Sequence, residues 1–331
     1  MVNPLLPAEF WGLSIGVYLF LGGLAGGAYV AGASADLLSV RQPDRRASYE
    51  KTARWSMVIA VLAIAVGGLL LLTHLGEPQH VLMFWLFTNF NSWMTIGIWV
   101  IIAFSVLAVV QALWLGFGRE HGFGVSLGLL DAVAQLTRPS EQVRRAITVA
   151  GIVVALVLAV YTALLISAAG DVVPLWHGTW LPLLFLTSSL SIGIAAVFGL
   201  TTLTQGFHRT GVKTFSLVDD AIILAELAVL AVLVWTMQNG GPTAVETVQY
   251  ILTEGWLLFW GGVVGVGLVA PLVLSGVVLA IERRFDLGAN SAMARRARTI
   301  YGLKFGLVVA GGLMLRLVII FGALNVPIIG A

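Results

Sequence analysis

The stretch that decides the fold is AITVAGIVVALVLAVYTALLISAA, residues 146–169, which contains no charged side chain. A helix needs about 20 apolar residues to cross the hydrocarbon core of a bilayer. Dividing the chain at its charged clusters yields eight such stretches, so the sequence predicts an all-α, polytopic membrane protein. Residues 1–331 are therefore predicted to form one integral membrane domain. Its predicted spans are about 10–38, 57–75, 95–117, 146–169, 179–204, 217–237, 257–281 and 305–324.

The overall composition supports this class. Of the 331 residues, 59% are hydrophobic and only 10% are charged, whereas soluble domains average about 25% charged residues. These values exclude a water-soluble globule and a disordered chain, and they leave no basic face for nucleic acid. Because the sequence contains no cysteine, it has no disulfide and no thiolate ligand for a metal centre.

The basic residues predict the orientation. Seventeen of the 18 Lys and Arg residues lie in the loops after the first, third, fifth and seventh predicted spans. The positive-inside rule places such loops in the cytoplasm, so both termini are expected outside. The cytoplasmic loops are predicted at residues 39–56, 118–145, 205–216 and 282–304. The short aromatic segment 80–94 is expected to be re-entrant or interfacial.

Tryptophan is concentrated on the predicted outer side, which holds nine of the 11 tryptophans. An interfacial belt is one explanation, because indole rings settle at the headgroup level. An ordered apolar surface, to which a partner protein docks, is the other explanation. The outer loops 76–94, 170–180 and 238–256 are the expected docking surface.

Two of the predicted spans together hold four ionisable residues, and charge within the membrane is costly and functional by default. Asp219, Asp220 and Glu226 belong to span 217–237, and Arg316 belongs to span 305–324. Glu226 and Arg316 are predicted at similar depth, so a buried ion pair is one interpretation. The other is a proton path from the cytoplasm, because Asp219 and Glu226 are two turns apart and share a helix face.

The five histidines restrict the possible redox sites. None lies in the middle of a predicted span, so a stack of haems across the membrane would have no imidazole ligands. One outer haem between His74 and His177 is the alternative. We expect no metal in this chain.

Small and aromatic residues mark the first and fourth predicted spans. Gly22, Gly23, Gly26 and Gly27 recur at a spacing of four, which favours close helix packing. Tyr18 and Tyr161 are predicted at equal depth in the outer half of the membrane. Two phenols at one depth are suited to hydrogen-bond a carbonyl of a flat aromatic ligand. The alternative is that they are interfacial tyrosines whose hydroxyls bond to neighbouring helices.

Four segments resemble the signature stretches of the NrfD/PsrC-like membrane subunits, in the family's order. They are WGLSIGVYLFLGGLAGGAYVAG (11–32), HLGEPQHVLMFWLFTNFNSWMTIGIW (74–99), VPLWHGTWLPLLFLTSSLSIG (173–193) and GGLMLRLVIIFG (311–322). Glu226 matches the acidic position of the family. The resemblance implies eight helices in two four-helix bundles, without haem, in the inner membrane of a prokaryotic cell.

The resemblance also implies a function. Such subunits bind menaquinone or ubiquinone and exchange electrons with a ferredoxin-like iron–sulfur subunit on the outer face. Their complexes contain molybdopterin-type or cytochrome-containing catalytic subunits. The implied quinone-binding residues are Tyr18, Tyr161, Trp176 and His177. The implied proton-transfer residues near the quinone are His74, Glu77 and Asp171, and those within the spans are Asp219, Asp220, Glu226 and Arg316.

Two alternative functions remain open from the sequence. One is a purely structural membrane anchor without a quinone site of its own. The other is an ion or small-molecule transporter that uses Glu226, Arg316 and the two aspartates, Asp219 and Asp220, as its ion path. In the quinone hypothesis the protein has no activity alone, because the enzyme is the complex.

Overall fold

In the computed structural model nearly all of the described residues are helical, and no strand occurs among them. The described residues are 12–73, 89–117, 122–123, 127–170, 173–176, 178–205, 212–284 and 291–324. The predicted segment 80–94 lies mostly outside this part of the chain. Asn89–Ser92 form a turn that leads into the third long helix.

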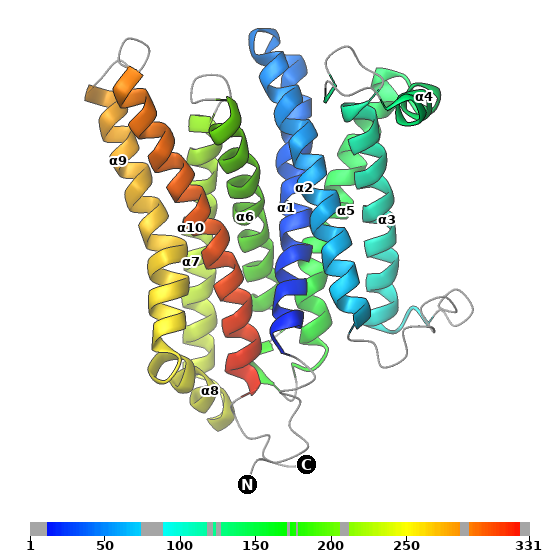
Figure 1. Ribbon diagram of the computed structural model, residues 1–331. Helices are drawn as coiled ribbons and strands as arrows, with labels where there is room; N and C mark the ends of the chain where they lie inside the picture. Colours follow the sequence, from blue (N-terminus) through cyan, green and yellow to red (C-terminus); the bar gives the residue numbers. More distant parts are fainter. Residues whose placement is uncertain are drawn as a thin grey trace.

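Long, nearly parallel helices form the body of the molecule (Figure 1). They are α1 (Leu13–Arg41), α2 (Arg46–Thr73), α3 (Trp93–Gly116), α5 (Glu141–Ser167), α6 (Trp180–Gln205), α7 (Val212–Gln238), η6 (Leu257–Val269) continued by α9 (Ala270–Arg284), and α10 (Ser291–Leu324). Short elements connect them: η2 (Pro43–Arg45), α4 (Gly128–Thr137), η4 (Pro174–Trp176) and α8 (Pro242–Thr253).

Seven of the described helices are long and apolar enough to cross a membrane. They are α1, α2 with η2, α3, α5, α6, η6 with α9, and α10. Helix α7, which contains the predicted span 217–237, is 27 residues long but is not one of the seven. By length and composition, the described part of the protein therefore contains one span fewer than the eight predicted.

Two helices begin earlier than the sequence predicts. Helix α2 begins at Arg46 rather than Met57, and α10 begins at Ser291 rather than Phe305. Much of the predicted loops 39–56 and 282–304 is therefore helical. The physical reason is that a helix can continue beyond the hydrocarbon core when its polar residues form ion pairs one turn apart. Arg46 and Glu50 of α2 form such a pair, with 2.9 Å between the charged groups.

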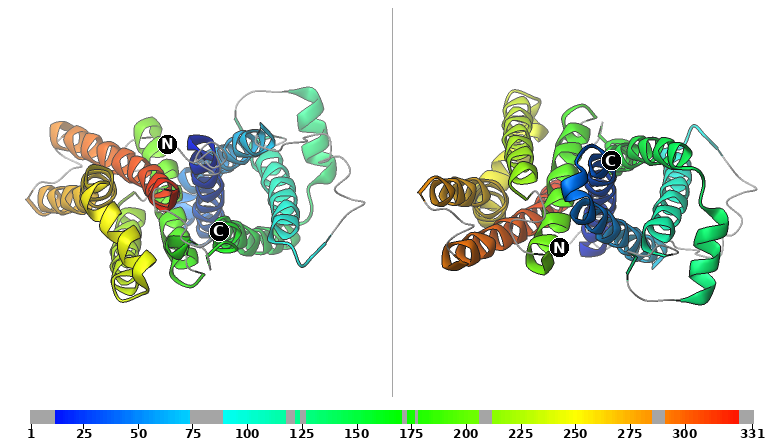
Figure 2. Two further views of the ribbon diagram at one scale, coloured as in Figure 1. Left: turned by 90° about the horizontal axis from the view of Figure 1, so that it is seen from below. Right: turned by 90° about the horizontal axis from the view of Figure 1, so that it is seen from above.

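The helices pack in two groups that meet at α1 and α6. Helices α1, α2, α3 and α5 pack against one another on one side of the molecule. Helices α6, α7, α9 and α10, with η6, pack together on the other side, and α1 contacts both α6 and α10 (Figure 2). Helix α1 is therefore the centre of the packing, and most of its residues are buried.

The glycine repeat of α1 permits this central position. A Cβ at Gly26 would lie 2.7 Å from the Ala155 carbonyl oxygen on α5, and one at Gly27 would overlap the Ser189 carbonyl on α6. Gly193 of α6 faces the Gly27 backbone. The predicted close packing is confirmed, and the repeat faces two helices, because adjacent residues of one helix point about 100° apart.

The basic residues gather at one end of the helices. Helices α1 and α9 finish there at Arg41 and Arg284, and α2, α5, α7 and α10 begin there (Figure 1). We call this the basic end. Helix α1 begins and α10 finishes at the opposite end, where α8 also lies.

Candidate functional site

Two buried phenols lie where the helices of the first group converge. Tyr18 on α1 is 2% exposed and Tyr161 on α5 is 4% exposed, and the two are close enough to interact electrostatically. The Tyr161 ring occupies the space beside Gly97 of α3, where a Cβ would overlap the phenol. Tyr18 lies beside Gly67 of α2. Glycines on two neighbouring helices thus make room for the two rings.

Trp176 joins the two groups of helices near the opposite end. Its indole N–H donates a 3.0 Å hydrogen bond to the Ile319 carbonyl on α10, and the side chain is buried. This contact directs the polar edge of Trp176 toward α10. The other predicted outer-face residues, His74, Glu77, Asp171 and His177, lie outside the described residues.

Tryptophans of the second group of helices are exposed at the same end. Trp235 of α7 is 65% exposed, and Trp256 and Trp260, before and within η6, are 56% and 51% exposed. Near them the predicted outer loop 238–256 contains the helix α8. The arrangement is compatible with both a membrane belt and a docking surface.

A buried ionic cluster lies between α6, α7 and α10, toward the basic end. The Lys304 ammonium of α10 is 2.7 Å from Asp220 Oδ1 and 3.3 Å from Asp219 Oδ2. Ser191 of α6 donates a 2.7 Å hydrogen bond to Asp219 Oδ1, and Ser275 of α9 donates a 2.9 Å bond to Asp220 Oδ1. The two aspartates predicted near the cytoplasmic end are therefore held together by one lysine.

Lys304 is the functional candidate that the sequence reasoning missed. The sequence predicts it in the loop 282–304, but its side chain is only 1% exposed. It also donates to the Ser216 carbonyl and hydroxyl, at 3.1 and 2.7 Å. A signal was present in the sequence, because Lys304 is separated from the basic residues 295–298 and is flanked by Leu303 and Phe305.

The cluster continues toward the basic end through the buried Tyr301 and the increasingly exposed Glu282 and Lys213. The Tyr301 hydroxyl is one turn of α10 from Lys304 and lies 3.5 Å from Glu282 Oε1. Lys213 pairs with Glu282 at 2.6 Å, and the Lys213 side chain is 54% exposed. Ionisable groups thus connect the solvated end of the helices with the buried aspartates.

A second buried charge site lies deeper, at Glu226 and Arg316. Arg316 is fully buried; it donates to the Ser188 and Ser189 hydroxyls and stacks over the Phe185 ring. Ser188 also interacts with the Glu226 carboxyl group. No direct Glu226–Arg316 ion pair forms within 4 Å in the described structure. The two charges interact electrostatically, and Ser188, whose hydroxyl can donate and accept at once, contacts both of them.

These two charge sites form a polar column along the α6–α7–α10 interface. Ser188 and Ser191 are one turn apart on α6, and Asp219 and Glu226 are two turns apart on α7. Each serine contacts the carboxyl group at its own level. We define the polar column as Glu282, Tyr301, Lys304, Asp220, Asp219, Ser191, Ser188, Glu226 and Arg316. It extends from the basic end into the middle of the second group of helices.

Another buried ion pair stabilises the first group of helices. Arg144 of α5 is 2.6 Å from Asp36 of α1, and both side chains are at most 3% exposed. Arg144 also pairs with the half-exposed Glu141 at 3.1 Å. The sequence placed Arg144 in a loop, whereas it lies in the first turn of α5.

Comparisons with known proteins agree with the resemblance seen in the sequence. The family model described as "Polysulphide reductase, NrfD" matches residues 3–327. The C subunit of polysulfide reductase from Wolinella succinogenes is 33% identical over 274 residues, which cover 80% of this protein and 82% of the relative. Protein NrfD of Escherichia coli K12 is 27% identical over 275 residues, covering 80% and 83%. With its membrane-spanning helices and its match over nearly the whole length, the chain belongs to the NrfD polysulphide reductase family.

Proposed function

We propose that this chain is the quinone- or quinol-binding membrane subunit of a respiratory oxidoreductase complex. It exchanges electrons with an iron–sulfur partner subunit on the outer face of a prokaryotic inner membrane. Family membership supports the general role, because a relative is named as one part of polysulfide reductase. The observation that carries the quinone site is that α1 and α5 hold Tyr18 and Tyr161 buried and close enough to interact electrostatically.

The two tyrosines suit the ligand chemically. A phenol O–H donates a hydrogen bond to a carbonyl oxygen, and a quinone presents two carbonyls on a flat apolar ring. A bound menaquinone or ubiquinone supplies two-electron, two-proton chemistry. In the proposal Tyr18 and Tyr161 orient the ring, Trp176 and His177 border the site, and His74, Glu77 and Asp171 exchange protons with the outer solvent.

The proposal includes eight spans in two four-helix bundles. Helix α7 is the eighth span, since it runs beside α6 over 27 residues and its charges belong to the polar column rather than to a lipid-facing surface. The two packing groups then correspond to the two bundles (Figure 2). The basic end is cytoplasmic by the positive-inside rule, and the termini are outside.

The polar column is proposed to transfer protons from the cytoplasmic side. Its carboxyl groups, hydroxyls and lysine alternate between donors and acceptors at hydrogen-bonding distances near the basic end, which is the arrangement that proton relays use. Glu226 and Arg316 form its deep end. In this function Glu226 exchanges the proton, and Arg316 positions the Glu226 carboxyl group through Ser188.

Quinone binding by Tyr→Phe variants tests the main proposal. We expect the purified wild-type protein to bind menaquinone or ubiquinone, and Tyr161→Phe to weaken binding roughly 2- to 10-fold, the value of one lost hydrogen bond. Tyr49→Phe is the matched control, because Tyr49 is also buried but bonds to Gln42 near the basic end. Absence of quinone binding by the wild-type protein would establish the structural-anchor alternative instead.

The proton path is tested separately with Glu226→Gln. We expect this variant to assemble with its partner subunits and to lose proton uptake coupled to quinone turnover. Glu246→Gln, an exposed carboxyl group on α8, is the control. Poor assembly of Glu226→Gln would show a structural charge instead, and ion uptake by proteoliposomes of this protein alone would favour the transporter.

A further inference from the structure

A large cavity lies at the basic end, beside the first turns of α2. Its volume is about 960 Å³, and it is lined by Pro43, Arg46, Ala47, Glu50, Lys51, Arg54, Trp55, Gly122 and Phe123. Cavities that bind small molecules typically measure about 300–1,000 Å³. Neither the quinone site nor the polar column includes any of these residues.

The cavity wall carries an excess of positive charge. Three cations, Arg46, Lys51 and Arg54, face one carboxylate, Glu50, which already pairs with Arg46 at 2.9 Å. Lys51 is exposed, and it has no ion-pair partner within the described structure. The cavity therefore favours an anionic ligand.

A smaller cavity extends the positive region. It measures about 310 Å³ and shares Pro43, Arg46 and Glu50 with the first cavity, and its lining adds two arginines, Arg144 and Arg145, against one further carboxylate, Glu141. The Arg145 Nε atom is buried without a hydrogen-bond acceptor among the described residues. An anion at Arg46 would thus be near further guanidinium groups.

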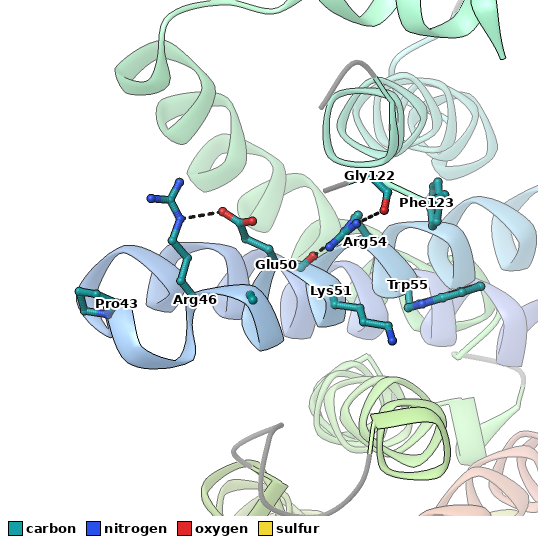
Figure 3. Close-up of a pocket in the computed structure, with 9 residues that line it drawn as sticks. Pro43, Arg46, Glu50, Lys51, Arg54, Trp55, Gly122 and Phe123 are labelled. Atoms are coloured by element: carbon teal, nitrogen blue, oxygen red, sulfur yellow. Dashed lines mark hydrogen bonds and ion pairs between the residues drawn. The ribbon is translucent and has the colours of Figure 1, made fainter. Parts of the chain in front are cut away.

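The two ends of the large cavity differ in polarity. Arg46 and Glu50 lie toward one end, while Trp55 and Phe123 lie at the other, with Lys51 between them (Figure 3). The Trp55 and Phe123 rings pack edge to face, 5.6 Å apart. Arg54 of α2 donates a hydrogen bond to the Gly122 carbonyl, so that α2 is tied to the residue before Phe123.

The length of this gradient matches the membrane interface. Nine residues of α2 separate Arg46 from Trp55, about 14 Å at 1.5 Å per residue. The apolar run of α2 starts at Met57, so Trp55 lies at the edge of the hydrocarbon core, where indole rings settle. Lys51, six residues or about 9 Å before Met57, consequently lies near the level of the lipid headgroups, and Arg46 lies about 7 Å further from the hydrocarbon core.

We propose that this cavity binds the headgroup of an anionic phospholipid such as phosphatidylglycerol. Lys51 contacts the phosphate, Arg46 attracts it electrostatically from further out along α2, and Trp55 and Phe123 border the start of the acyl chains. Clusters of basic residues directly beside the cytoplasmic end of a membrane helix are suited to such headgroups. The aromatic end distinguishes a lipid from a free phosphate ion, which would gain nothing from two apolar rings.

Native mass spectrometry of the detergent-purified protein tests the proposal, with phosphatidylglycerol and phosphatidylcholine of identical acyl chains as probes. We expect selective retention of phosphatidylglycerol. A cation near anionic lipid contributes about 1 kcal/mol, so Arg46→Gln/Lys51→Gln should weaken binding roughly thirtyfold. Both side chains are exposed, so the double variant is expected to fold normally.

Arg45→Gln is the matched control, because Arg45 is a neighbouring exposed cation that does not line the cavity. The affinity of this variant for phosphatidylglycerol should stay within about twofold of wild type. A further arm adds inorganic phosphate at roughly 10 mM, which should leave the lipid bound if the phosphate ion alone binds only weakly. Equal retention of the two lipids, wild-type affinity in the double variant, or displacement of the lipid by phosphate would each overturn the proposal.

Discussion

Replacement of Lys304 by methionine should destabilise the protein strongly. Methionine preserves the approximate length of the side chain and removes its charge. The change would leave Asp219, which is fully buried, with Ser191 as its remaining hydrogen-bond partner among the described residues. The Asp220 carboxylate would lose less stabilisation, because its side chain is 16% exposed and it keeps the hydrogen bond from Ser275.

The expected magnitude follows from this burial. Removing one partner of a buried ion pair costs about 3–5 kcal/mol, because the other charge is left without compensation. We expect Lys304→Met to lie near the lower value, about 3 kcal/mol, since Ser191 still solvates Asp219 in part. That difference changes the unfolding equilibrium constant by roughly 150-fold.

Reversible unfolding of the purified protein in mixed micelles, followed by circular dichroism, measures this change. The double variant Lys304→Met/Asp219→Asn should regain most of the stability, because the stranded carboxylate is gone. Lys213→Met is the matched control: Lys213 also pairs with a carboxylate, at 2.6 Å, but is 54% exposed, so its loss should cost about 1 kcal/mol or less. The reasoning is refuted if Lys304→Met costs no more than Lys213→Met, or if Asp219→Asn brings no recovery.

Three other predictions follow from packing, charge and topology. Gly27→Ala should destabilise the α1–α6 contact by about 1–3 kcal/mol in the same unfolding assay, whereas Gly68→Ala, which meets no atom within 4 Å, should be neutral or stabilising. Asp36→Ala should lower the free energy of unfolding by about 3 kcal/mol, because it leaves the buried Arg144 guanidinium without its buried carboxylate partner. An equal loss of stability in the double variant Asp36→Ala/Arg144→Met would contradict this explanation. With no native cysteine in the sequence, an impermeant thiol reagent on intact cells should label a cysteine that replaces Asn239 and spare one that replaces Ser140, and the reverse pattern would invert the topology.

The sequence alone determined the class of fold. A run such as residues 146–169 has one stable environment, because its apolar side chains require lipid or a protein core and its backbone must satisfy its own hydrogen bonds. The grouping of the basic residues at one end followed from the same local information. The glycine repeat of α1 also predicted close packing, since the absence of a side chain is itself a local property.

Helix ends and buried polar partners depended on the tertiary structure. Lys304 and Arg144 lie at the ends of stretches that contain several charged residues, and composition alone places such stretches in loops. Both are buried because helices continue past the apolar core and bring carboxylates from distant helices to them: Asp219 and Asp220 to Lys304, and Asp36 to Arg144.

The relation between Glu226 and Arg316 shows why depth along a helix is insufficient. The sequence placed the two charges at a similar level, but a contact also depends on the rotation of each helix and on what lies between them. Ser188 of α6 lies there, and serine is too common in membrane helices to be singled out in advance. Composition and periodicity therefore determined which residues enter the membrane, whereas only the packing of α6, α7 and α10 decided which of them meet, because side-chain contacts between distant segments depend on helix rotation and register.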